Sequence, residues 1–164
     1  MPSIRPFRGL LYAPGKAPIA KVATEPYDKI SPAMQEAYSR RHPLNFVRLI
    51  LDKIQPGDDA KNNRYRRAAN RLEQWIEKGV LRPDPAPAYY LYEQAFQVLG
   101  LGLRIRRGII GLMRLEDFAK GNVLPHERTL AKPRKDRFLL LKATRANLEQ
   151  IFLMYDDARG KLEK

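Results

Sequence analysis

Cysteine is absent from this chain of 164 residues, and histidine occurs only at His42 and His126. The lack of cysteine excludes disulfides, thiolate zinc sites and a cysteine nucleophile. Two histidines are too few for a histidine-rich metal site within one chain. No run of about 18 uncharged apolar residues occurs, so the sequence predicts no membrane span. Because the N-terminus lacks an apolar stretch of signal-peptide length, we expect a cytoplasmic protein.

Several sequence motifs are missing as well. Gly100 and Gly102 fit neither the phosphate-binding P-loop nor the dinucleotide fingerprint, and no Gly-x-Ser-x-Gly elbow occurs. No pair of helices with the turn of a helix-turn-helix motif is visible, which counts against that class of DNA-binding protein. Aromatic residues do not alternate with Lys and Arg along the chain as in many single-strand binders.

The chain is strongly basic, with 31 Lys and Arg against 18 Asp and Glu, a formal charge of +13 and a pI of about 10.2. The excess is present in both halves, because residues 1–82 carry 16 basic and 8 acidic groups and residues 83–164 carry 15 and 10. Such a charge favours an anionic partner: a nucleotide, a phosphorylated metabolite, nucleic acid or an acidic protein surface. With 44% apolar residues, the chain can also bury a core.

The length favours one domain. We expect an α+β domain over residues 1–157 and a frayed polar tail over residues 158–164. Its sheet is expected to be mixed and largely antiparallel, with a central hairpin and two or three helices. Outside the hairpin, the predicted elements are a strand over Ile4–Tyr12, a helix capped by Ser31 and running to about Arg41, a strand over Asn45–Leu51, a helix over Pro133 to about Ala143, and a last strand over Ile151–Tyr155.

The strongest helical pattern follows a turn at Gln55–Asp59. Asp58 or Asp59 is expected to cap this helix, and Gly79 to end it. Apolar residues recur with a period of about 3.6 over four turns. They are Tyr65, Ala68, Ala69, Leu72, Trp75 or Ile76, and Val80.

A hairpin is predicted from Ala88–Val98, a turn at Gly100 and Gly102, and a return strand over Leu103–Leu115. One side of the return strand is apolar and predicts a buried face, although Arg107 falls on it. The apolar side comprises Leu103, Ile105, Ile109, Met113 and Leu115, and the other side Arg104, Arg106 and Arg114.

The densest group of reactive side chains begins at His126 and Glu127. Histidine beside a carboxylate supplies a base near neutral pH, so these two residues are the candidate catalytic pair. Thr129 is a candidate ligand contact. Lys132 and Arg137 are candidate phosphate-binding residues, because cations near a helix start can hold phosphate oxygens. The alternative is that His126 caps a loop and the charges are solvated.

A second group, Arg64, Arg67 and Arg71, lines one face of the strong helix. Cations in the first turn of a helix oppose its dipole, and a phosphate bound by Arg64 and Arg67 would compensate. The alternative is that Asp58 and Asp59 supply the neutralising charge.

A third feature is the turn Glu25–Ser31. Pro26 fixes this turn, which either aims Asp28 at a ligand or is an ordinary Asx-type turn.

Together these residues resemble the bacterial family called domain of unknown function 1015. The resemblance covers nearly the whole chain and rests on Ile4–Leu10, Pro26-Tyr27-Asp28, Asn63-Arg64-Tyr65 with Ala68-Ala69, Tyr92-Glu93-Gln94, Leu124–Glu127 with Thr129, Asp136-Arg137 and Tyr155-Asp156-Asp157. Members are usually longer, so the resemblance implies an amino-terminal part with a missing C-terminal half. Glu25 stands where the family commonly has proline.

Asn62–Ala69 is also similar to the motif Gly-Glu-Arg-Arg-x-Arg-Ala-Ala of ParB proteins, although Asn62, Asn63 and Tyr65 depart from it. That similarity implies contacts to nucleotide phosphates, and some relatives are small-molecule kinases. The favoured hypothesis is therefore a phosphate-handling domain that binds a nucleotide, with Mg²⁺ as a candidate cofactor, and transfers or hydrolyses a phosphoryl group. The alternatives are a catalytically silent fragment of a larger protein and a non-enzymatic nucleic-acid-binding or partition-type module.

Overall fold

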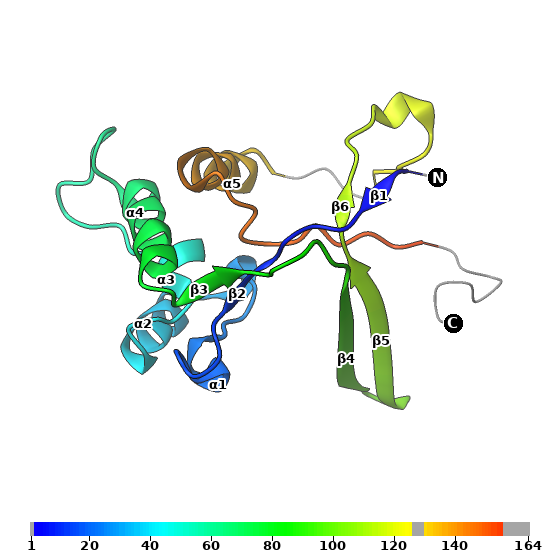
Figure 1. The fold of residues 1–164 in the computed structure, drawn as a ribbon, viewed down its shortest axis with the longest axis horizontal. Helices are drawn as coiled ribbons and strands as arrows, with labels where there is room; N and C mark the ends of the chain where they lie inside the picture. The colour runs from blue at the N-terminus through cyan, green and yellow to red at the C-terminus, as the bar shows by residue number, and fades with distance from the viewer. Residues whose placement is uncertain (1, 126–129, 156–164) are drawn as a thin grey trace.

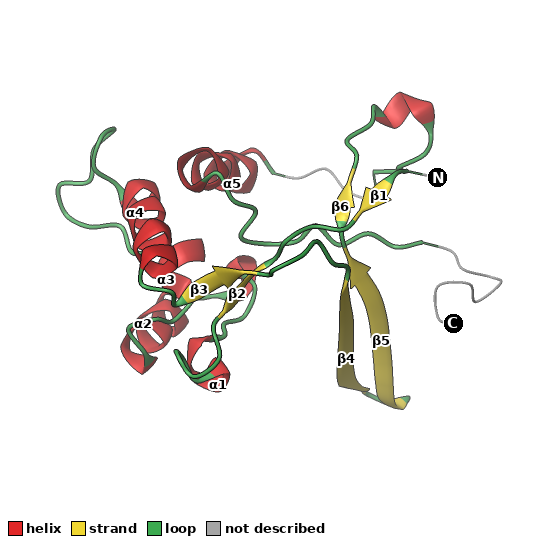
Figure 2. Ribbon diagram, in the orientation of Figure 1, coloured by secondary structure: helices red, strands yellow, loops and turns green. Residues whose placement is uncertain are grey.

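The computed structural model describes residues 2–125 and 130–155. Its helices and antiparallel strands confirm the α+β class (Figure 2). The helices are α1 (Ile19–Val22), α2 (Pro32–Arg41), α3 (Val47–Ile50), α4 (Arg64–Glu77) and α5 (Ala131–Thr144), with 3-10 turns η1 (Tyr27–Lys29) and η2 (Phe118–Lys120). The strands are β1 (Ile4–Arg5), β2 (Leu10–Tyr12), β3 (Leu81–Pro83), β4 (Tyr90–Val98), β5 (Gly102–Ile110) and β6 (Leu112–Met113).

The described strands form three separate two-stranded ladders, β1–β6, β2–β3 and β4–β5, all antiparallel. The expected single mixed sheet is therefore absent from the described residues. The opening segment does not form one strand either. It pairs through β1, through a bridge from Phe7 to Ala88, and through β2. Pro6 lacks a backbone N–H, which interrupts the ladder between these pairings.

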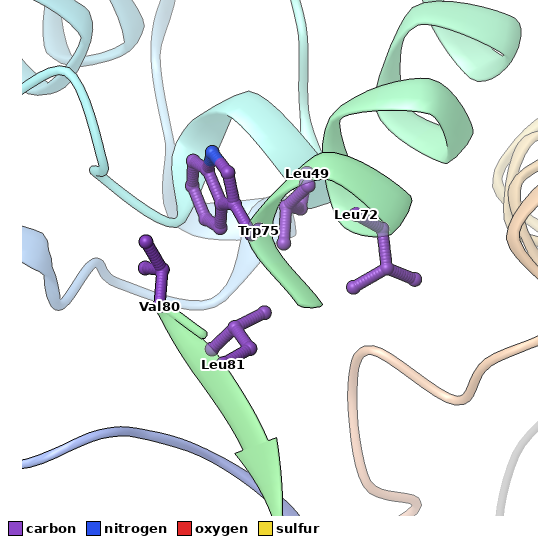
Figure 3. Packing of buried hydrophobic residues seen from close by; sticks show 5 residues of the cluster. All are labelled: Leu49, Leu72, Trp75, Val80 and Leu81. Carbon is purple, nitrogen blue, oxygen red and sulfur yellow. The ribbon is translucent and has the colours of Figure 1, made fainter. Parts of the chain in front are cut away.

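The apolar core lies where α2, α3, α4 and β3 meet. Leu49, Leu72, Trp75, Val80 and Leu81 form one buried cluster (Figure 3). A second cluster contains Ile30, Tyr38, Val47 and Ile50. The apolar stripe expected on the strong helix is confirmed, because Ala68, Ala69, Leu72 and Trp75 of α4 are all buried.

The predicted strand over Asn45–Leu51 is wrong, because this run forms the short helix α3. Asn45 explains the difference. Its side chain is fully buried, accepts a hydrogen bond from the Val47 N–H at 3.0 Å and donates one to the Lys21 carbonyl at 2.8 Å. An Asn side chain that bonds to the backbone two residues further on starts a turn and competes with a strand ladder.

The predicted cap of α4 is wrong, whereas its predicted end is confirmed. Asn63 caps the helix by accepting from the N–H groups of Tyr65 and Arg66, so the expected cap at Asp58 or Asp59 is wrong. The Asp59 carboxylate instead accepts from two backbone N–H groups in the preceding turn. The stop at Gly79 is confirmed. Its φ of +63° is left-handed, and its N–H and that of Val80 donate to the Ile76 and Trp75 carbonyls in a Schellman motif.

The other helix predictions hold with shifted ends. Ser31 caps α2 through a hydrogen bond from the Met34 N–H, and this helix ends at Arg41 as expected. The predicted last helix is α5, which begins at Ala131 rather than Pro133. No helix in the described part of the chain is long and apolar enough to cross a membrane.

The hairpin β4–β5 exists as predicted and extends away from the helices (Figure 1). The expected buried face is wrong for the described residues, since Leu103, Ile105 and Ile109 are 58%, 51% and 41% exposed. The return strand also breaks at Gly111, after which β6 pairs with β1. The predicted last strand is wrong too, because residues 151–155 form exposed, irregular chain. The predicted tail lies outside the described residues.

Candidate functional site

A network of arginines and carboxylates occupies the amino-terminal half of α4. Arg64, Arg67 and Arg71 are spaced along one face of the helix, and their side chains are only 21%, 17% and 24% exposed. Each is paired with a carboxylate from another part of the chain. We call these three residues the α4 arginine row.

Arg67 makes the densest set of contacts in this row. Its Nη1 and Nη2 donate to the two oxygens of Asp58, at 2.6 and 3.0 Å. Its Nε donates to Asp52 at 3.2 Å, and Nη2 also donates to the Lys53 carbonyl at 2.7 Å. The Oδ1 atom of Asp52 also lies 3.4 Å from Nη1 of Arg71, so this one carboxylate links two members of the row. Every guanidinium nitrogen of Arg67 therefore already donates within the protein.

Arg64 connects the row to α5. It forms an ion pair with Asp136, and the Tyr65 hydroxyl donates to the same carboxylate at 2.7 Å. Burial acts to raise the pKa of Asp136, but the Tyr65 hydrogen bond and the positive charges of Arg137 and Arg64 outweigh it, so this pKa lies below its usual value. Asp136 is consequently a stable anion that joins α4 to α5.

Arg137 lies on the other side of Asp136. Its Nε donates to Asp136 at 3.0 Å, its Nη1 to Glu149 at 3.0 Å, and its Nη2 to the Ile50 carbonyl at 2.9 Å. Its guanidinium carbon also lies 3.9 Å from the centre of the Tyr27 ring, a cation–π contact. Since the Tyr27 N–H donates to Glu149 at 3.1 Å, this network ties α5 to the turn that carries Asp28.

The structure thus brings Arg64 and Arg137 to one carboxylate and places Arg67 in a neighbouring cluster. All three have partners inside the chain, so phosphate binding by them stays a prediction. Asp28 is exposed in η1 beside this network. His126, Glu127 and Thr129 lie outside the described residues, and their predicted roles stay predictions. Among the described residues, no group of three His, Asp or Glu side chains could hold a metal ion.

The sequence reading missed Asp52 and Glu149, which complete these clusters. Arg67 and Asp52 are 15 residues apart, and Tyr27 and Glu149 are 122 apart. Periodicity reports contacts within one helix or strand and carries no signal for pairs at such separations. Only the excess of arginine on an otherwise half-buried helix face indicated that acidic partners were needed.

The start of α5 differs from the α4 arginine row. Lys132, Arg134 and Lys135 are exposed, and none forms an ion pair with another described residue. Leu130 occupies the N-cap position and has no side-chain acceptor, so the first turn lacks a side-chain cap. A shallow pocket of about 420 Å³ lies here, lined by Ala131, Arg134, Lys135 and Phe138. We call this feature the α5 basic pocket.

Fold and side chains together define a basic α+β protein with an internal arginine–carboxylate network and, at the start of α5, exposed cations that form no ion pair with another described residue. The model of one protein family matches residues 4–164. The chain therefore belongs to the family described as protein of unknown function (DUF1015), which confirms the family resemblance. No curated protein and no solved structure matches this chain.

Proposed function

We propose that this protein is a phosphate-handling domain that binds a nucleotide at the α5 basic pocket. The observation that carries the proposal is the contrast between the two basic groups. The α4 arginine row is neutralised by carboxylates, whereas Lys132, Arg134 and Lys135 are exposed beside a helix start that lacks a side-chain cap. An anion is stabilised at such a place by the helix dipole and by the cations.

The lining of the pocket favours a nucleotide over inorganic phosphate. Phe138 is 60% exposed at the pocket and offers an apolar ring for a base, while Arg134 and Lys135 offer charge for phosphates. Pockets for small ligands combine apolar walls with a few polar groups in this way. In this proposal Lys132 contacts phosphate, and Arg64, Arg67 and Arg137 hold α4 and α5 in place around it.

Phosphoryl transfer is the finer part of the proposal. His126, Glu127 and Thr129 directly precede α5 in the chain. They are therefore close in sequence to the start of this helix, where the proposed ligand binds. Glu127 or His126 would act as base, and a Mg²⁺ ion would accompany the nucleotide. ParB-like phosphate contacts through Arg64 and Arg67 are not part of this proposal, because the ion pairs of both residues lie within the chain.

Thermal unfolding in the presence of ATP, ADP, GTP or CTP, with and without Mg²⁺, tests the binding step. A ligand present at about 100 times its dissociation constant adds about 2.7 kcal/mol to the free energy of unfolding. For a chain of this size the midpoint should rise by about 5–10 °C. A flat response to every nucleotide would contradict the proposal.

A matched pair of triple variants locates the site. Replacing Lys132, Arg134 and Lys135 with Gln should abolish the nucleotide-dependent shift. The control replaces Lys16, Lys61 and Arg66 with Gln, three exposed cations elsewhere, and removes the same charge. A loss of equal size in both variants would show general electrostatic attraction rather than a site at α5.

A further inference from the structure

One face of the β4–β5 hairpin, which extends away from the helices (Figure 1), combines aromatic rings with arginines. Directly opposed residues on this side of the ladder are Tyr92 and Gly108, Gln94 and Arg106, and Phe96 and Arg104. We call these six residues the hairpin aromatic face. Aromatic residues do not alternate with Lys and Arg along the sequence, and here the pairing of the two strands brings them together.

The hairpin aromatic face carries positive charge and no carboxylate. Arg104 and Arg106 are exposed, and neither forms an ion pair with another described residue. The nearest acidic residue of β4, Glu93, points to the other side of the ladder, where its carboxylate pairs with Arg107 at 2.9 Å. In contrast to the α4 arginine row, the two arginines of this face therefore remain available to an anion such as phosphate.

The aromatic rings of this face keep exposed surface. Tyr92 is 39% exposed and Phe96 is 38% exposed. Because the two residues are four positions apart on one strand, their Cα atoms lie about 13 Å apart. Each ring can therefore stack on a different base. Phe152, in the irregular segment after α5, adds a third ring beside the face and is 55% exposed.

Contacts within the chain hold the charge beside the rings. The guanidinium of Arg106 lies 5.8 Å from the centre of the Phe96 ring and 4.9 Å from that of Phe152. The side-chain oxygen of Gln94 accepts hydrogen bonds from Arg106 and, at 2.9 Å, from the Tyr92 hydroxyl. A surface that is ordered before the ligand arrives loses less conformational entropy on binding.

We propose that the hairpin aromatic face binds single-stranded nucleic acid. Bases stack on Tyr92 and Phe96, while Arg104 and Arg106 contact the phosphates. The net charge of +13 favours the approach of such a polyanion. In a duplex the bases are stacked on one another, so a double strand offers phosphates to the arginines but no base to the rings. The proposal does not depend on nucleotide binding at the α5 basic pocket, which other residues line.

Ring removal in the full chain tests the stacking contacts by fluorescence anisotropy with a labelled oligothymidylate. Phe96→Leu and Tyr92→Leu each remove a ring without a change in charge and should weaken binding by about 5- to 150-fold. Phe118→Leu is the matched control, since it makes the same change at a 57% exposed ring in η2, and it should leave the affinity unchanged. Unfolding midpoints close to that of the wild type show that the hairpin variants remain folded.

The dependence on salt tests the phosphate contacts. Arg104→Gln should weaken binding and should reduce the slope of log affinity against log salt by about 0.7, the value for one phosphate contact on a single strand. Phe96→Leu should lower the affinity and leave this slope unchanged, because stacking releases no counterion. Lys61→Gln, at an exposed cation outside the hairpin, is the control and should change neither quantity.

Three further probes decide between this site and general attraction by a basic protein. An abasic strand of equal length and a duplex should both bind more weakly than oligothymidylate, because neither offers a base to the rings. Oligouridylate shows whether RNA or DNA binds more tightly, and tight binding of either supports the proposal. Equal affinity for the abasic strand or for the duplex overturns it and indicates attraction by net charge alone. Absence of binding to both single strands at low salt overturns it as well, as does an equal effect of Phe96→Leu and Phe118→Leu.

Discussion

The guanidinium of Arg67 and the carboxylate of Asp58 lie edge to edge, joined by two parallel hydrogen bonds of 2.6 and 3.0 Å. This bidentate arrangement is the strongest geometry available to an arginine and a carboxylate. It also explains how the chain tolerates a cation in the first turns of α4, where a positive charge opposes the helix dipole. The compensating negative charge comes from within the chain, from a residue that precedes the helix.

Arg67→Ala should lower the midpoint of thermal unfolding in the absence of any ligand. The substitution leaves Asp58 and Asp52, whose side chains are 14% and 10% exposed, without their shared partner. Removing one member of a largely buried ion pair is destabilising because the other charge stays desolvated. Arg66→Ala is the matched control, since Arg66 is exposed on the same helix. Equal midpoints for the two variants would contradict this structural role.

The same network predicts a loss of stability in acid. Hydrogen bonds from Arg67 lower the pKa of Asp58, and Tyr65, Arg137 and Arg64 lower that of Asp136 despite its burial. The usual carboxyl value, 3.8, applies to both groups in the unfolded chain. In the range between the lowered and the usual pKa, the unfolded chain binds more protons, so stability rises with pH there.

The contribution of both groups is therefore complete above about pH 5 and is lost as the pH falls through 3.8 towards the lowered values. Unfolding midpoints measured from pH 7 down to pH 3 should stay level at first and then fall. Asp58→Asn and Asp136→Asn should each make this fall shallower, because the variant has one fewer group to protonate. If the curves of the variants ran parallel to that of the wild type, the lowered pKa values of Asp58 and Asp136 would not contribute to the loss of stability in acid.

Structural features that depend on residues close together in the sequence are predictable, whereas features that depend on distant residues are not. The Ser31 cap, the apolar stripe of α4 and the stop at Gly79 depend on residues a few positions apart, and all three were predictable. The predicted strand over Asn45–Leu51 is wrong because a short apolar stretch has the same composition in a strand and in a buried helix. The bonds of the Asn45 side chain decided between the two.

The candidate site was predictable in part for the same reason. The helical spacing of Arg64 and Arg67 placed both on one face of α4, as the structure shows. Their partners could not be foreseen, because Asp136 lies 72 residues beyond Arg64 and α4 packs on α5 only in the folded chain. The unburied hairpin was equally unforeseeable, since alternation along a strand predicts a face and does not tell what covers it.

Asn45 should be among the most sensitive polar positions of the described chain. Asn45→Ala removes a fully buried side chain and leaves the Val47 N–H and the Lys21 carbonyl without their partners. Unsatisfied buried groups cost about 1–3 kcal/mol each, so we expect the two groups to lower the free energy of unfolding by about 2–6 kcal/mol. Urea unfolding measures this loss. Asn70→Ala, at an exposed position on α4, is the control and should be neutral or slightly stabilising.

Phe138→Ala separates recognition of a base from recognition of phosphate in the α5 basic pocket. Phe138 is 60% exposed, so its removal should leave the unfolding midpoint of the free protein nearly unchanged. Stacking of a base on an aromatic ring is worth about 1–3 kcal/mol, and nucleotide affinity should fall by about 5- to 150-fold. Inorganic triphosphate makes no stacking contact, so its affinity should not change. Lys135→Gln, one turn away in the same pocket, should weaken both ligands alike, because it removes charge and leaves the ring. Titration calorimetry measures the affinity of each variant for the nucleotide and for triphosphate. A loss of triphosphate binding in Phe138→Ala would contradict this division of roles.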